Sequence, residues 1–168
     1  MACEFAVNDY VVYGKSGLCI VKEIKQMSMA GGPLAQYYIL GNAYENDVTI
    51  YVPCDKDNLV AKMRRPMTKE EIDNVLEHTK GQEINWIENS IERADYFKQI
   101  ADSENYSDWL LLAACLHLRK TQRAAVGKHL AGRDESMLRL LEKLIEQEFC
   151  YSLQLKPEQL GRYIQERL

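Results

Sequence analysis

The spacing of apolar residues changes once along the chain, near residue 66, and this change constrains the fold more than any other feature of the sequence. Before it, β-branched and aromatic residues form short runs between turn residues, which predicts strands. After it, apolar residues recur at three- and four-residue spacing, which predicts amphipathic helices. We therefore expect an α+β fold in which strands and helices belong to separate domains. The predicted strands cover residues 9–13, 17–24, 36–40 and 48–52, with a short fifth strand at 59–61.

Residues 1–65 are expected to form the first domain, a small β-barrel or strongly curved sheet. Closure would leave few unpaired strand edges, which matters for a unit too small to be very stable alone. If closure is incomplete, residues 48–52 are the best candidate for an exposed strand, with Thr49 and Tyr51 pointing outward. Such an edge can accept a strand from a partner protein. The alternative is that this strand pairs wholly inside its own barrel.

Residues 66–168 are expected to form an all-helical second domain of about five helices. Its first helix begins with a capping box, in which the Thr68 hydroxyl and the Glu71 carboxylate each accept from a backbone N–H group. Later helix starts and stops follow from the breakers between apolar stretches. The predicted helices cover residues 69–79, 85–101, 106–123 and 133–153, and a fifth begins at Pro157.

The charge distribution limits how the chain could bind nucleic acid. Residues 1–68 carry seven Lys/Arg and seven Asp/Glu, and residues 69–168 carry the remaining fourteen and eighteen, for a net charge of −4. A protein that binds DNA mainly by neutralising phosphates is basic. Any DNA contact must therefore be local, or assisted by a partner that holds the protein in place. The sequence has neither a signal peptide nor a long apolar run, so we expect a cytoplasmic protein with no membrane partner.

No motif for catalysis or cofactor binding is present. The chain lacks the GxSxG, P-loop and GxGxxG patterns, its five cysteines form no CxxC, and its three histidines have no metal-ligand spacing. We therefore predict no catalytic residue, no metal, no cofactor and no small-molecule substrate. The cysteines are expected to be reduced thiols, mostly buried. An enzyme that uses Cys54 and His78 is an alternative only if the two side chains lie within hydrogen-bond distance.

Trp86 is the strongest single candidate for a functional side chain. It precedes a predicted helix, where a large apolar residue can pack on its own domain as a staple. It can also insert beside a base step in the minor groove and stabilise distorted DNA. Trp109, in the most apolar predicted helix, is expected in the core. Cations on either side of the following loop could meet phosphates or could be solvated helix ends; they are Arg119, Lys120, Arg123, Lys128, His129 and Arg133.

The order of these features resembles the CarD/CdnL/TRCF family. The N-terminal resemblance rests on Phe5, Asp9, the sequence Val11-Val12-Tyr13-Gly14, Gly17, and the strand from Val48 to Pro53. The C-terminal resemblance rests on Asn85-Trp86 and on residues 130–148. It implies a Tudor-like (SH3-like) domain that binds the β subunit of bacterial RNA polymerase, followed by a helical domain found in CarD and CdnL. It also implies a non-enzymatic transcription regulator.

The family implies that a tryptophan wedge enters the minor groove at the upstream edge of the transcription bubble, without reading sequence, and slows collapse of the open promoter. Carried over by position, the polymerase contact falls on Thr49, Ile50, Tyr51 and Val52. The DNA contact falls on Trp86, Arg93, Lys128 and Arg133.

The chain departs from the family pattern at acidic positions. Glu88 and Glu92 follow Trp86 where the family has basic residues, Glu135 stands where lysine is common, and Tyr51 stands where relatives carry arginine. The alternative function is therefore a protein-interaction module that docks on polymerase and recruits another protein through its acidic helical domain. An exposed indole among cations would favour DNA, and a buried indole beneath an acidic face would favour the interaction module.

Overall fold

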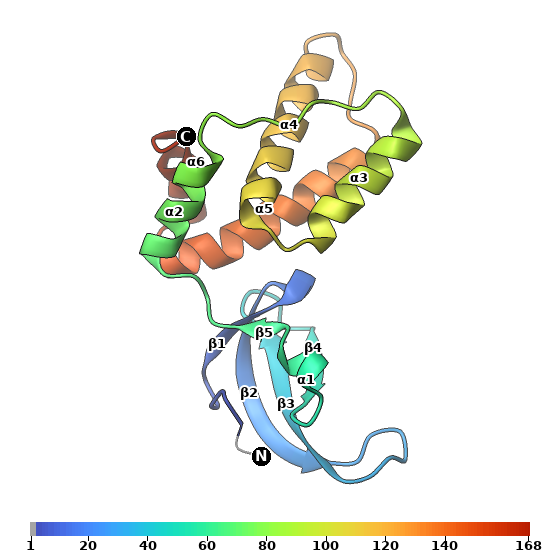
Figure 1. Ribbon diagram of the computed structural model, residues 1–168, viewed down its shortest axis with the longest axis vertical. Coiled ribbons are helices and arrows are strands. Elements are labelled where there is room, and N and C mark those ends of the chain that lie inside the picture. The colour runs from blue at the N-terminus through green and yellow to red at the C-terminus, as the bar shows by residue number, and fades with distance from the viewer. Residues whose placement is uncertain (1–2) are drawn as a thin grey trace. The chain divides into compact units, whose positions relative to one another are not determined.

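The computed structural model describes residues 3–168, which form two compact units (Figure 1). The first unit ends at Pro66 and the second begins at Met67. Each unit encloses its own hydrophobic core. Strands occur only in the first unit and five of the six α-helices occur in the second, so the α+β fold class is confirmed for the described residues. Within those residues, no helix is both long enough and apolar enough to cross a membrane.

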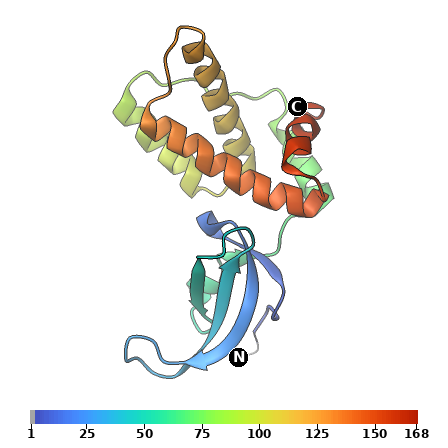
Figure 2. The same cartoon turned by 180° about the vertical axis from the view of Figure 1, so that it is seen from behind.

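The first unit is a curved antiparallel sheet of five strands in the order β4-β3-β2-β1-β5. A β-bulge shifts the β2–β3 register between Val21 and Glu23, and a bulge of this kind increases local bending. The curvature of β2 and β3 is visible in Figure 2. The strands are β1 (Tyr10–Tyr13), β2 (Leu18–Met27), β3 (Ala35–Asn42), β4 (Thr49–Pro53) and β5 (Met63–Arg64), with a short turn η1 (Gly14–Ser16) and a helical turn α1 (Asp57–Val60).

The predicted strand at residues 59–61 is wrong. Leu59 and Val60 belong to α1, and their backbone N–H groups both donate to the Lys56 carbonyl. The fifth strand lies just beyond, where Met63 pairs with Tyr13 and buries its side chain in the core. Three apolar residues are too few for periodicity to distinguish a strand from a helical turn. The long-range pairing with β1 decides the outcome.

The N-terminal segment packs on the core of the first unit. Phe5 is buried and meets Tyr38 edge to face, with ring centroids 6.1 Å apart. The Phe5 backbone N–H donates to the Tyr38 hydroxyl at 3.3 Å. Val11, Val21 and Leu40, which belong to β1, β2 and β3, are fully buried in the same core. The segment around Phe5 is therefore held in place by β3.

The second unit consists of five helices around one apolar core. Helices α4 and α5 lie side by side in both views (Figure 1, Figure 2). Trp109 is buried and its indole N–H donates to the Ile100 carbonyl at 3.0 Å, which confirms its place in the core. The helices are α2 (Lys69–Thr79), α3 (Ser90–Asp102), α4 (Tyr106–Ala124), α5 (Gly132–Leu153) and α6 (Pro157–Gln165).

The starts predicted for the first two helices of the second unit differ in outcome. The capping box at α2 is confirmed, since the Glu71 N–H donates to the Thr68 hydroxyl at 3.2 Å and the Thr68 N–H to the Glu71 carboxylate at 2.8 Å. The predicted start of the next helix at residue 85 is wrong. Asn89 is the N-cap of α3 and accepts from the N–H groups of Ile91 and Glu92, at 3.0 and 3.1 Å. Trp86 therefore lies on an irregular segment before the helix.

Candidate polymerase and nucleic-acid interfaces

Strand β4 forms one edge of the sheet. Among the described strands it pairs only with β3, with Thr49 opposite Gly41 and Tyr51 opposite Ile39. The alternative in which this strand pairs wholly inside a closed barrel is therefore not what the sheet shows. An edge strand presents unpaired backbone N–H and C=O groups to any partner that can add a strand.

The side chains of β4 alternate as a half-buried strand requires. Thr49 is exposed and Tyr51 exposes 42% of its surface, whereas Ile50 is half-buried and Val52 is completely buried. Thr49 and Tyr51 can therefore contact a partner directly, while Ile50 and Val52 hold the strand on the core. A depression of about 260 Å³ lies beside the strand and is lined by Lys22, Ile39, Leu40, Gly41, Asn42, Glu45, Asn46, Val48 and Thr49.

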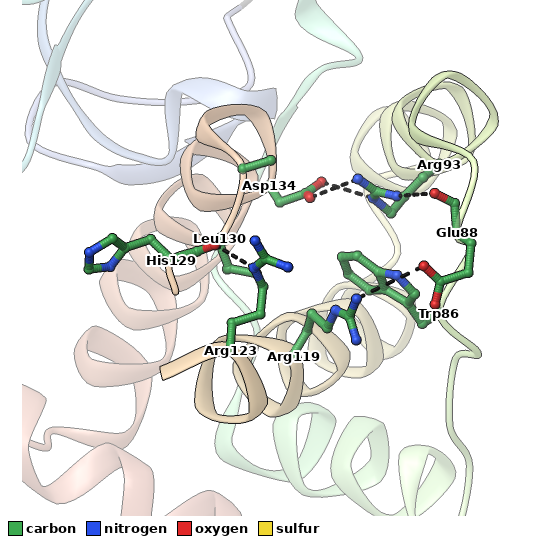
Figure 3. Close-up of a pocket in the computed structure, with 9 residues that line it drawn as sticks. Trp86, Glu88, Arg93, Arg119, Arg123, His129, Leu130 and Asp134 are labelled. Carbon is green, nitrogen blue, oxygen red and sulfur yellow. Dashed lines mark hydrogen bonds and ion pairs between the residues drawn. The ribbon is translucent and has the colours of Figure 1, made fainter. Parts of the chain in front are cut away.

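Trp86 is half-buried on the second unit and lies between two cations (Figure 3). The Arg93 guanidinium carbon is 4.4 Å from the indole centroid and that of Arg119 is 4.9 Å away. The indole also meets the core residue Phe97 edge to face, with centroids 6.2 Å apart. Its Nε1 is buried without a hydrogen-bond partner. Cation–π contact and core packing thus fix the ring, while its one donor stays unsatisfied.

Arg93 lies in the interior of the second unit, which differs from the surface position that a DNA contact requires. Its Nη2 and Nε lie 3.1 and 3.3 Å from the two carboxylate oxygens of Asp134, and both side chains are more than nine-tenths buried. Its Nη1 donates to the carbonyls of Ile87 and Glu88, at 2.8 and 3.1 Å. The predicted phosphate contact by Arg93 is therefore corrected. Its charge is neutralised by Asp134, and its donors hold the segment that carries Trp86 (Figure 3).

The cations that remain on this face come from the end of α4 and the loop after it. Arg119 and Arg123 stand one helical turn apart on α4 and line an open pocket beside Trp86. The Arg123 Nε donates to the His129 carbonyl. The pocket has a volume of about 420 Å³ and is lined by Trp86, Glu88, Arg93, Arg119, Arg123, His129, Leu130, Ala131 and Asp134.

Lys128 and Arg133, both predicted to contact DNA, are exposed, and each is next in sequence to a residue that lines this pocket. Within residues 3–168, neither side chain takes part in an ion pair. Their charges are available to a partner, unlike that of Arg93. Arg119 and Arg123 were grouped with these cations by sequence but not singled out. Their four-residue spacing on one helix was the signal that could have identified them.

Two of the acidic residues that depart from the family pattern, Glu88 and Glu135, lie close to cations. Glu88 is 82% exposed and its carboxylate lies 3.9 Å from Arg119. Glu135 lies 2.9 Å from Lys120 and 3.7 Å from Arg139. The hydrogen bond from Lys120 lowers the pKa of the Glu135 carboxyl. The pocket beside the indole therefore carries both guanidinium groups and carboxylates, and the charged groups that contact the ring itself are Arg93 and Arg119.

The other chemistry considered from sequence involves Cys54 and His78. Cys54 lies in the first unit beside Cys3, and burial raises the pKa of its thiol to about 12. A thiol with so high a pKa is almost wholly protonated at neutral pH and is a poor nucleophile. His78 lies in α2 of the second unit. Within the described part of the chain, no three His, Cys, Asp or Glu side chains are grouped to hold a metal ion.

Comparison with known families supplies the identity of the first unit. Residues 5–67 match the family model of the CarD-like/TRCF RID domain, which covers the curved sheet and ends where the second unit begins. The first unit belongs to this family. RID domains are protein-interaction modules, generally for RNA polymerase, so the match supports a role for the first unit in contacting RNA polymerase. No curated protein matches the chain.

Proposed function

We propose that this protein regulates bacterial transcription by binding the RNA polymerase β subunit through β4 and by prolonging open promoter complexes through Trp86. The observation that carries the proposal is that one chain has both a RID domain with an open β4 edge and a separate helical unit whose indole contacts two guanidinium groups. The protein is proposed to be non-enzymatic, bacterial and cytoplasmic.

Docking through β4 rests on the edge geometry. A strand of the β subunit can pair with the free side of β4, and main-chain hydrogen bonds then supply affinity. Thr49 and Tyr51 would add side-chain contacts because both are exposed on this strand. Exposed aromatic side chains are common energetic anchors in interfaces. Tyr51 is therefore the residue on which we expect docking to depend most.

Contact with DNA is proposed to depend on docking. A chain with a net charge of −4 has little affinity for DNA through phosphate neutralisation alone. Attachment to polymerase would raise the effective concentration of the helical unit near the promoter, so weak local contacts suffice. The phosphate contacts are assigned to Arg119, Arg123, Lys128 and Arg133. Arg93 is assigned to positioning because its charge is already paired with Asp134.

Trp86 is proposed to act at the upstream edge of the transcription bubble. Its ring would insert beside an opened base step in the minor groove, where an aromatic wedge offsets part of the cost of unstacking. Contacts made only in the open state shift the closed–open equilibrium toward it. No base-specific hydrogen bond is needed, so the effect should not depend on promoter sequence at this position.

The test is the lifetime of open promoter complexes formed by bacterial RNA polymerase, measured after addition of a competitor. The 168-residue chain should lengthen the lifetime, and its Trp86→Ala variant should bind polymerase normally without lengthening it. Ile91→Ala is the matched control because Ile91 is 70% exposed on the neighbouring helix and should leave the effect unchanged. Tyr51→Ala should require about tenfold more protein for the same effect. Equal lifetimes with wild type and Trp86→Ala would contradict the wedge.

A second candidate is favoured by the partial burial of Trp86 and the acidic excess of the second unit. In this case the RID domain docks on polymerase and the helical unit binds another protein rather than DNA. It predicts polymerase binding with no change in open-complex lifetime for wild type or variants. Crosslinking between the helical unit and upstream promoter DNA within the complex would count against it.

A further inference from the structure

Two cysteines that are far apart in the sequence meet at one end of the sheet in the first unit. The sulfur atoms of Cys3 and Cys54 lie 3.3 Å apart, and the residues are separated by 51 positions. Both side chains are half-buried, so a small reagent can reach them. Cys19 and Cys150 are buried and Cys115 lies in the second unit. The sequence suggested only reduced thiols, because no short cysteine motif links this pair.

We propose that Cys3 and Cys54 form a reversible intramolecular disulfide when the protein meets a peroxide, and that this bond fastens the N-terminal segment to the end of β4. The proposal concerns the RID domain alone, and it does not depend on DNA contact by the second unit. Nothing in the family match assigns a role to either thiol.

The backbone on both sides of the sulfur pair is already held by β3. Phe5, two residues after Cys3, is buried against Tyr38, and its backbone N–H donates to the Tyr38 hydroxyl. The Cys54 backbone N–H donates to the Gln36 carbonyl at 2.8 Å. A disulfide requires the sulfur atoms to approach to about 2 Å with a suitable dihedral angle. From 3.3 Å, rotation about the side-chain bonds covers most of that distance, so the bond would fix an arrangement that exists before oxidation.

The reaction balances with hydrogen peroxide as oxidant. Peroxide converts the first thiol to a sulfenic acid and releases one water. The second sulfur then attacks the sulfenic sulfur, the S–S bond forms, and a second water leaves. Two thiols thus lose two protons and two electrons, and one peroxide becomes two waters. Either sulfur can be oxidised first in this scheme, because the other lies 3.3 Å away and is in position for the second step.

The bond would act on the strand proposed to meet polymerase. Cys54 directly follows Pro53, the last residue of β4. A link to Cys3 therefore limits fraying at this end of the edge strand. It also closes a loop of about fifty residues in the unfolded chain, which lowers the entropy of that state and stabilises the oxidised domain. Oxidation is expected to preserve the folded docking edge.

The experiment uses the reduced 168-residue chain with and without hydrogen peroxide. After treatment, the thiols titrated under denaturing conditions should fall from five to three, and the mass should fall by two hydrogens. Peptide mapping without reduction should recover a crosslinked peptide that contains Cys3 and Cys54. Dithiothreitol should restore all five thiols, and non-reducing electrophoresis should show a monomer.

The variants separate this pair from general oxidation. Cys3→Ser and Cys54→Ser should abolish the crosslink, while Cys115→Ser should retain it and lose one thiol from each count. The melting temperature of the first unit should rise on oxidation of the wild type and stay constant for Cys3→Ser. Recovery of Cys3 and Cys54 as separate alkylated, sulfinic or intermolecularly linked residues in the wild type would overturn the proposal. This readout needs no variant to fold.

Discussion

Replacing Asp134 with asparagine should destabilise the second unit strongly, because it removes one charge of a buried ion pair and leaves the other. The Arg93 and Asp134 side chains are only 9% and 7% exposed, so solvent screens the remaining guanidinium little. Removing one partner of such a pair costs about 3–5 kcal/mol. Asparagine keeps one acceptor oxygen, so we expect about 3 kcal/mol, the lower end of that range. A domain of this size would then melt roughly 10–20 °C lower.

The assay is urea unfolding followed by tryptophan fluorescence. Both tryptophans of the chain, Trp86 and Trp109, lie in the second unit, so the signal reports this unit alone. The matched control is Arg162→Ala, which removes an exposed ion pair with Glu166 and should cost about 0.5 kcal/mol or less. The difference between the two variants measures the effect of burial.

A double substitution tests the cause. Replacing Arg93 with methionine and Asp134 with leucine removes both charges and keeps the combined volume of the two side chains roughly similar. We expect the double variant to recover to within about 1–2 kcal/mol of wild type, because no unpaired charge stays buried. A loss below about 1 kcal/mol for Asp134→Asn, or additive losses in the double variant, would refute the reasoning.

Two further predictions concern the capping box and the buried thiols. Thr68→Ala should lower the stability of the second unit by about 1 kcal/mol in the fluorescence assay, because Glu71 loses the acceptor of its N–H, and Thr68→Ser should keep most of it. The first unit should lose stability as pH rises above 9, because burial raises the pKa of Cys19 to about 11 and that of Cys54 to about 12. The folded domain then retains thiol protons that the unfolded chain releases, so the stabilisation is complete below pH 9 and lost toward pH 12. Calorimetry would check this, with tryptophan fluorescence used to identify the unfolding transition of the second unit. An unfolding transition of the first unit that does not change from pH 8 to pH 11 would contradict the prediction.

Local signals in the sequence were sufficient for most of the fold. The change of apolar spacing separated a β unit from a helical unit, and the capping pair Thr68 and Glu71 marked the start of α2. Where local signals were weak, the prediction failed. Residues 59–61 carry three apolar side chains that suit a strand or a helical turn equally, and only the distant β1 determines that β5 begins at Met63.

The candidate site was predicted less well, because it depends on contacts between distant parts of the chain. From sequence, Arg93 is predicted to be a surface cation near Trp86. In the structure it is buried in an ion pair with Asp134, which is 41 positions away in the sequence. Cys3 and Cys54 likewise meet only through the sheet. Edge exposure of β4 was accessible from sequence as one of two alternatives. The order of strands was needed to choose between them.

The interior position of Arg93 makes mechanical sense if Trp86 acts as a wedge. Insertion beside a base step costs a few kcal/mol in unstacking, and a side chain on a loose segment would move aside rather than hold the step open. Trp86 lies on an irregular segment with no helical hydrogen bonds of its own, and Arg93 bonds the two carbonyls that follow it. Asp134 in turn fixes Arg93. In the proposed function, Asp134→Asn should therefore shorten the lifetime of open complexes even at temperatures where the variant is folded. This effect would come from positioning alone, because the negatively charged Asp134 carboxylate would not bind phosphate itself.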